Sequence, residues 1–218
     1  MKDLLMGFKL IRYGAKYKMF LTTSILYFAI GVLLEYVNNG AGAVGFIYLQ
    51  IVSGMLIASA LSIESADFFL ASPKMKKLQT SVPAFMYFVF LTIAFAISVL
   101  LKLYFVSTGL DVAVAARSLI VGSIFGVITL VYYAVSYKIM IVATVFFIVI
   151  AIPAMILIMN SALLDRIGVN VPWGFGLAAV ISYLILLAGV LVYYLVARAL
   201  YKLPFSKYAF RGIMSQQK

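Results

Sequence analysis

The feature that most constrains this chain is a series of apolar segments, each about as long as a membrane-spanning helix. Six of them can be marked, at about 19–34, 44–63, 83–101, 118–137, 139–164 and 173–197. A helix of about 20 apolar residues crosses the hydrocarbon core of a bilayer. Charged residues are only 11% of the chain, too few for the surface of an ordinary soluble domain. We therefore expect an all-α membrane protein with six transmembrane helices, forming one transmembrane domain over residues 1–218.

The basic residues between these segments predict how the chain is oriented. Fourteen of the 17 lysines and arginines lie on one side, including Lys138 and the tail 199–218. The positive-inside rule places that side, with both termini, in the cytoplasm. Lys102, Arg117 and Arg166 then lie outside, and Glu35 and Lys102 are interpreted as ordinary interface residues at outer span ends. Because the charges are confined to short segments between spans, the net charge of +11 does not indicate a nucleic-acid partner.

Several kinds of chemistry are excluded by composition. The chain has no histidine and no cysteine, so Cys-His nucleophiles, imidazole or thiolate metal sites and disulfides are not possible. No GxxxxGK[ST] phosphate-binding motif occurs. We expect no catalytic residue, no metal site and no cofactor in this chain, which is therefore not expected to be an enzyme.

The first 16 residues have the pattern of an amphipathic helix in the membrane interface. On a helical projection the apolar side chains fall on one face and the basic ones on the other. We expect the first group to contact acyl chains and the second to lie among lipid headgroups. The apolar group is Leu4, Phe8 and Ile11, and the basic group is Lys9, Arg12 and Lys16.

Small residues at four-residue spacing mark two of the spans as helix-packing surfaces. They are Gly54, Ala58 and Ser62 in the second span, and Gly122 and Gly126 in the fourth. Such spacing lets helices approach closely in lipid.

The fifth apolar segment is irregular because Pro153 lies inside it. Proline removes a backbone donor, which predicts a kink or break within one turn. Two forms remain open: a helix that breaks and re-enters the membrane, and a single long kinked helix. In either form Asn160 and Ser161 are expected to face protein or an aqueous vestibule.

The segment 64–81 is the longest polar interruption on the predicted cytoplasmic side. It passes from acids through an aromatic pair and a Ser-Pro turn to a basic run, and it predicts a short helix at about 66–77, parallel to the membrane. The residues expected to contact a cytoplasmic partner are Asp67, Phe68, Phe69, Leu70, Ser72, Pro73 and Lys74. The alternative is a solvated loop whose lysines only set the topology.

This architecture, with the run Phe69-Leu70-Ala71-Ser72-Pro73-Lys74, resembles the permease subunits of type-2 ATP-binding-cassette exporters, of the small bacterial six-span kind that exports peptides. The resemblance implies a coupling helix in 64–81, docked on a separate cytoplasmic ATPase that holds ATP and magnesium. It also implies a second permease subunit, identical or related, short re-entrant helices between spans five and six, a peptide-like cargo, and the bacterial plasma membrane as the location.

The residues point to the same function by another argument. The spans show no buried chain of ionisable groups for ion coupling, so uphill transport would need energy from a partner. The apolar, aromatic and methionine-rich walls suit an amphipathic cargo. Two rivals remain: a secondary carrier or channel, and a non-transporting immunity or scaffold protein.

Overall fold

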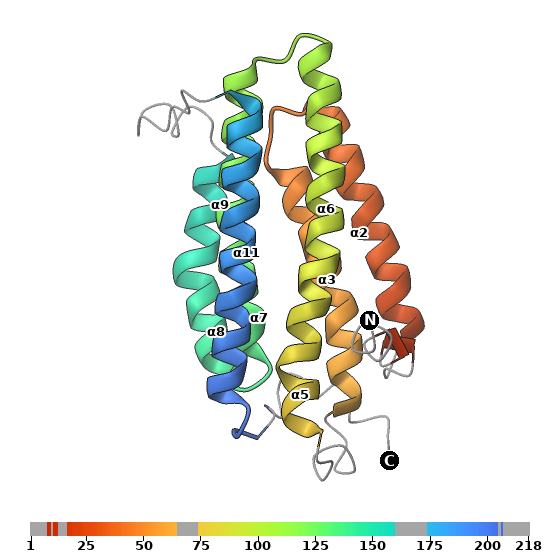
Figure 1. Cartoon of the computed structure of the whole chain (residues 1–218), viewed down its shortest axis with the longest axis vertical. Helices are drawn as coiled ribbons and strands as arrows, with labels where there is room; N and C mark the ends of the chain where they lie inside the picture. The colour runs from red at the N-terminus through yellow and green to blue at the C-terminus, as the bar shows by residue number, and fades with distance from the viewer. Residues whose placement is uncertain are drawn as a thin grey trace.

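The structure, a computed structural model, describes residues 8–9, 11–12, 17–64, 74–159, 174–204 and 206. Within these ranges every regular element is a helix, and the long helices lie side by side along the longest axis (Figure 1). The elements are α2 (Tyr17–Val37), α3 (Val44–Glu64), α5 (Met75–Gln79), α6 (Ser81–Ser107), α7 (Val112–Ser136), α8 (Met140–Phe146), η1 (Phe147–Ala151), α9 (Ile152–Met159) and α11 (Phe175–Leu200). The all-α fold class is therefore confirmed for this part of the chain.

Five of the helices are long and apolar enough to cross a membrane. They are α2, α3, α6 with α5, α7 and α11, and they fit a multi-pass membrane protein. The predicted fifth span is divided into α8, η1 and α9, and its apolar helical stretch Met140–Ile156 is shorter. Many large apolar side chains on the outer faces of the bundle are exposed, as lipid-facing side chains are.

Three helix ends differ from the sequence prediction, because polar residues there are satisfied by the fold. The α7 helix begins at Val112, six residues earlier than predicted, since the Asp111 carboxylate accepts a hydrogen bond from the Ala113 amide at 2.9 Å. The α2 and α6 helices continue through Glu35 and Lys102, where the prediction had ended both spans. These two side chains bind each other, so neither needs to leave the bundle for water.

Near Pro153, where the sequence predicted a kink or a break, the structure has a π-helical turn and the helix continues. This turn, η1, lies immediately before the proline, and the Ile152 amide bonds to the Phe147 carbonyl, five residues back. Proline has no amide proton to give to Val149, so the wider turn redistributes the backbone bonds without ending the helix. Asn160 and Ser161 lie outside the described residues, and the choice between re-entry and a full crossing stays open.

The core divides into an aromatic lower part, toward the end of the bundle where α2 begins, and an apolar upper layer toward the opposite end. The lower part includes four tyrosines from α6, α7 and α11, which we call the tyrosine cluster: Tyr87, Tyr133, Tyr137 and Tyr193. The upper layer is built from Phe46, Phe95, Leu119 and Leu186. Burying phenolic rings in a membrane bundle requires partners for their hydroxyl groups, so the lower part is the more polar of the two.

Candidate coupling site at the basic end of the bundle

The basic end of the bundle is the end where α2 begins and α3, α7 and α11 finish (Figure 1). Most described cations lie there, whereas Lys102 and Arg117 lie at the opposite end. The cations of the basic end include Lys18, Lys74, Lys76, Lys77, Lys138, Arg198 and Lys202, and Lys9 and Arg12 precede α2. The basic end thus corresponds to the side that the positive-inside rule predicts to be cytoplasmic.

Only the last part of the predicted coupling segment is described. Lys74 precedes α5, which lies directly before the start of α6 (Figure 1). Thr80 separates the two helices with φ −121° and ψ −71°, and its hydroxyl donates to the Lys76 carbonyl at 2.7 Å. The remaining residues predicted for coupling lie outside the described part: Asp67, Phe68, Phe69, Leu70, Ser72 and Pro73. The orientation of a helix at 66–77 therefore stays a prediction.

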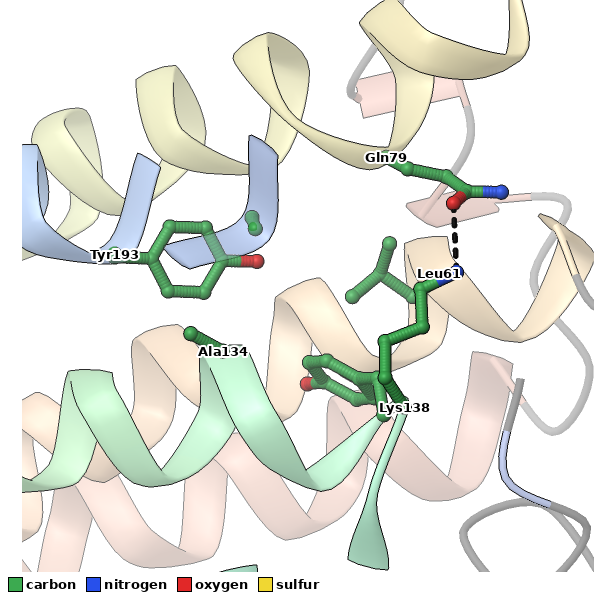
Figure 2. Close-up of a pocket in the computed structure, with 7 residues that line it drawn as sticks. Leu61, Gln79, Ala134, Lys138 and Tyr193 are labelled. Atoms are coloured by element: carbon green, nitrogen blue, oxygen red, sulfur yellow. Dashed lines mark hydrogen bonds between the residues drawn. The ribbon is translucent and has the colours of Figure 1, made fainter. Parts of the chain in front are cut away.

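Lys138 joins three parts of the basic end. It lies in the turn between α7 and α8, and its ammonium group donates to Gln79 Oε1 at 2.8 Å (Figure 2). It also donates to the Leu203 carbonyl at 2.9 Å. Gln79 ends α5, and Leu203 follows α11. We call this set of bonds the Lys138 bridge. It couples the position of α5 to those of α7 and α11.

Two further contacts strengthen the same junction. The Lys76 ammonium lies 5.2 Å from the centre of the Tyr201 ring, which places α5 against the end of α11. The Ser206 amide donates to the Tyr137 carbonyl at 2.9 Å. A displacement of α5 would therefore disturb α11 directly as well as through Lys138.

A small pocket of about 20 Å³ lies beside the bridge. Gln79, Tyr137, Lys138 and Tyr193 provide its polar lining, and Tyr193 points its hydroxyl toward it (Figure 2). The described residues contain no cluster of acids that could hold a metal ion.

At the opposite end, Lys102 and Glu35 form a buried ion pair. The ammonium nitrogen lies 3.1 Å from Glu35 Oε2, and both side chains are fully buried. It also donates to the carbonyl oxygens of Gly40 at 2.8 Å and Gly42 at 2.9 Å. Three acceptors match the three donors of a lysine ammonium. The interpretation of Glu35 and Lys102 as interface residues was wrong, because the pair neutralises both charges inside the bundle.

The α2–α3 turn is shaped to present these two carbonyl groups. Gly40 has φ +72°, and a Cβ there would lie 2.8 Å from the Phe105 ring. Asn39 also has a positive φ, of 48°. A side chain at position 40 would be strained by its backbone conformation and would collide with α6. Lys102 thus fixes a turn whose form depends on glycine.

The residues predicted to lie in the membrane interface differ in their exposure. Phe8, Lys9 and Arg12 are exposed, and the Phe8 ring also contacts Phe90 edge-on at 5.9 Å. Ile11 was expected to contact acyl chains, but it is buried in the lower core. Its carbonyl accepts a hydrogen bond from Ser59 at 3.2 Å, which draws this turn against α3. Leu4 and Lys16 lie outside the described residues.

The small residues predicted for packing lie at close helix contacts. A Cβ added to Gly122 would come within 2.6 Å of the Phe46 ring, and one added to Gly54 would overlap Tyr133. At Gly126 it would overlap the Gln50 side chain. Ala58 is half-buried against the lower core, and the side chain of Ser62 is outside the description. The glycines thus admit large side chains of neighbouring helices between the backbones.

Sequence reasoning missed the two lysine-centred sites because it treated each charge singly. Lys138 was counted only as a topology signal, although it is the one charge in a short apolar turn. Glu35 and Lys102 have opposite charges and were predicted at the same membrane face, which was the available signal for their pairing.

No family model, no curated protein and no solved structure matches this chain.

Proposed function

We propose that this chain is the transmembrane subunit of an ATP-driven exporter, with its basic end in the cytoplasm and ATP hydrolysed by a separate subunit. The observation that carries the proposal is the Lys138 bridge. An exporter of this design needs a cytoplasmic segment whose movement is transmitted to the helices around the transport path. Here α5, the end of the predicted coupling segment, is bonded to the α7–α8 turn and to the end of α11.

The dimensions of the fifth segment support a six-span arrangement. The helices α8, η1 and α9 have 7, 5 and 8 residues in unbroken succession. At about 1.5 Å per residue they extend roughly 30 Å, which is the thickness of the hydrocarbon core. Six crossings return the chain to the side on which it started, as the charge distribution requires. The proposed setting is the bacterial plasma membrane, with a second permease subunit alongside.

The proposed cargo is an amphipathic or hydrophobic molecule, most simply a peptide. The outer faces are apolar and aromatic, and the described pockets near the basic end contain few charged groups. Such surfaces favour cargo that partitions toward the bilayer over sugars or ions.

The experiment is recovery of the ATPase partner with the full-length, epitope-tagged chain from mild-detergent extracts of cells that make it. We expect ATP hydrolysis in the eluate, and loss of it in a Phe68→Ala/Phe69→Ala variant that still inserts in the membrane. Phe28→Ala, a change of the same kind at an exposed position of α2, is the matched control. Equal recovery from all three proteins would remove the coupling role of the loop. Absence of an ATPase from the unmodified protein would remove the exporter proposal.

A carrier driven by an ion gradient is the second candidate, because the buried Glu35–Lys102 pair is the kind of group that marks ion pathways in membranes. The three acceptors around the Lys102 ammonium, two of them in the α2–α3 turn, favour a structural role instead. Transport into vesicles distinguishes the two: an exporter needs ATP, whereas a carrier works without ATP and stops when an ionophore collapses the gradient.

A further inference from the structure

A second small cavity lies inside the bundle, further from the basic end than the Lys138 pocket. We call it the Gln50 cavity. Its volume is about 10 Å³, and it lies where α3, α6 and α7 meet. Five hydrogen-bonding side chains line it: Gln50, Ser53, Tyr87, Thr129 and Tyr133. All the lining residues belong to the described part of the chain, and none of them is charged. The cavity is therefore polar but offers no counter-charge to an ion.

In the Gln50 side-chain amide, the nitrogen has a hydrogen-bond partner and the oxygen has none. Its Nε2 donates to the Gly122 carbonyl at 3.2 Å, which fixes the orientation of the amide. Its Oε1 is buried and has no hydrogen-bond partner among the described residues. This oxygen is directed at the position where Gly126 lacks a side chain, and Gly126 also lines the cavity. A buried carbonyl oxygen beside empty space requires a donor.

Two other oxygens in the lining can only accept from a ligand in the cavity. Ser53 gives its proton to the Gln50 backbone carbonyl at 2.5 Å, and Thr129 gives its proton to the Phe125 carbonyl at 3.0 Å. A molecule in the cavity must therefore be a hydrogen-bond donor with at least two protons. Water meets this requirement, and the volume matches one water molecule.

The tyrosine cluster connects this cavity to the Lys138 pocket. Tyr87 and Tyr133 line the upper space, and Tyr137 and Tyr193 line the lower one. The Tyr87 ring lies 4.6 Å from that of Tyr193 and 6.2 Å from that of Tyr133. Tyr133 and Tyr137 are one helical turn apart on α7, as are Leu130 and Ala134, which line the same two spaces. The two cavities are thus stacked along α7.

We infer that water enters from the basic end and occupies both cavities, forming a hydrated polar path that ends at Gln50. Beyond Gln50 the path meets the apolar upper layer of Phe46, Phe95, Leu119 and Leu186. Phe46 is 0% exposed there, and its ring lies 6.0 Å from that of Phe95. The bundle is therefore wetted from one side and sealed toward the end that holds the Glu35–Lys102 pair. This inference does not depend on the exporter proposal.

The experiment is pulsed hydroxyl-radical labelling of the full-length chain in lipid nanodiscs, read by mass spectrometry. Radicals generated from bound water modify adjacent side chains even where bulk solvent has no access. We expect modification of Tyr87 and Tyr133, although Tyr87 is fully buried, and none of Phe46. If neither Tyr87 nor Tyr133 is modified in the native protein, the inference is overturned.

Two variants keep the test independent of folding defects. Thr129→Val retains the volume of the side chain but removes an acceptor, and Gln50→Leu removes the unsatisfied oxygen. Each is expected to lower labelling of Tyr133 by roughly threefold or more, because a water needs two to four polar partners. Ser24→Ala, a buried polar change on α2 away from both cavities, should leave labelling unchanged. Undiminished labelling in both cavity variants would show that no water is bound at Gln50.

Discussion

The Lys102 ammonium group fastens the α2–α3 turn to α6 by binding Glu35 and two backbone carbonyls. The nitrogen lies 3.1 Å from Glu35 Oε2, inside a bundle where neither side chain reaches solvent. Removal of one member of a buried pair leaves an uncompensated charge in a medium of low dielectric constant. Removal of either side chain alone should therefore destabilise the fold, because the other charge would remain buried without a partner.

We expect Lys102→Met to lower the free energy of unfolding by about 3–5 kcal/mol, because Glu35 and two carbonyls lose their partner. Thermal unfolding in detergent micelles measures the change. Lys202→Met, at an exposed lysine, is the matched control and should unfold like the native protein. In the Glu35→Leu/Lys102→Met double variant, part of the lost stability should return. A Lys102→Met protein as stable as the native one would contradict the role given to the pair.

Lys138→Met is expected to separate α5 from the end of α11. Hydrogen bonds to a charged group contribute about 1.5–3 kcal/mol each when their partners are removed from water. Hydrogen–deuterium exchange should therefore become faster at α5 and at residues 200–204, with little change in α2. Gln79→Leu should reproduce the effect at α5, because it removes the same 2.8 Å bond from the other side. Unchanged exchange in both variants would show that the Lys138 bridge does not hold the two segments.

Gly122→Ala is expected to destabilise the bundle, because its Cβ would lie 2.6 Å from a carbon of the Phe46 ring. Overpacking of this kind costs about 1–3 kcal/mol. Gly176→Ala makes the same change near the start of α11, where no atom lies within 4 Å of the new Cβ. There alanine should be neutral or slightly stabilising, since it favours the helix. Equal unfolding temperatures for the two variants would contradict close packing at Gly122.

Ile11→Ala tests whether the amino-terminal segment is packed on the bundle or only on lipid. Loss of a buried isoleucine typically costs about 2–5 kcal/mol, and Ile11 is only 6% exposed. Leu26→Ala, at a 57% exposed position of α2, is the control for the loss of lipid-facing apolar surface. We expect a lower unfolding midpoint for Ile11→Ala alone. If the two variants unfold at the same temperature, Ile11 does not belong to the folded core.

The helical class and the approximate positions of the long helices could be predicted from the pattern of apolar segments alone. Apolar segments of bilayer length have no other stable form in lipid, because every backbone group must be bonded within its own helix. Pro153 likewise predicted the irregular turn, since the missing amide proton is a local property. The close approach at Gly122 was also readable, because it depends on the absence of a side chain.

The partners of the polar residues, in contrast, depend on how the helices pack against one another. Glu35 and Lys102 are 67 positions apart, and Lys138 meets Gln79 across 59 positions. The pattern of apolar and polar residues within one helix carries no information about partners on another helix. Glu35, Lys102 and Lys138 were therefore each assigned to a membrane surface. Helix packing brought each lysine to acceptors that satisfy it, which moved Lys102 into the interior and extended α2 and α6 past their expected ends. The buried position of Ile11 has the same origin, because only the assembled bundle presents Ser59 to its carbonyl.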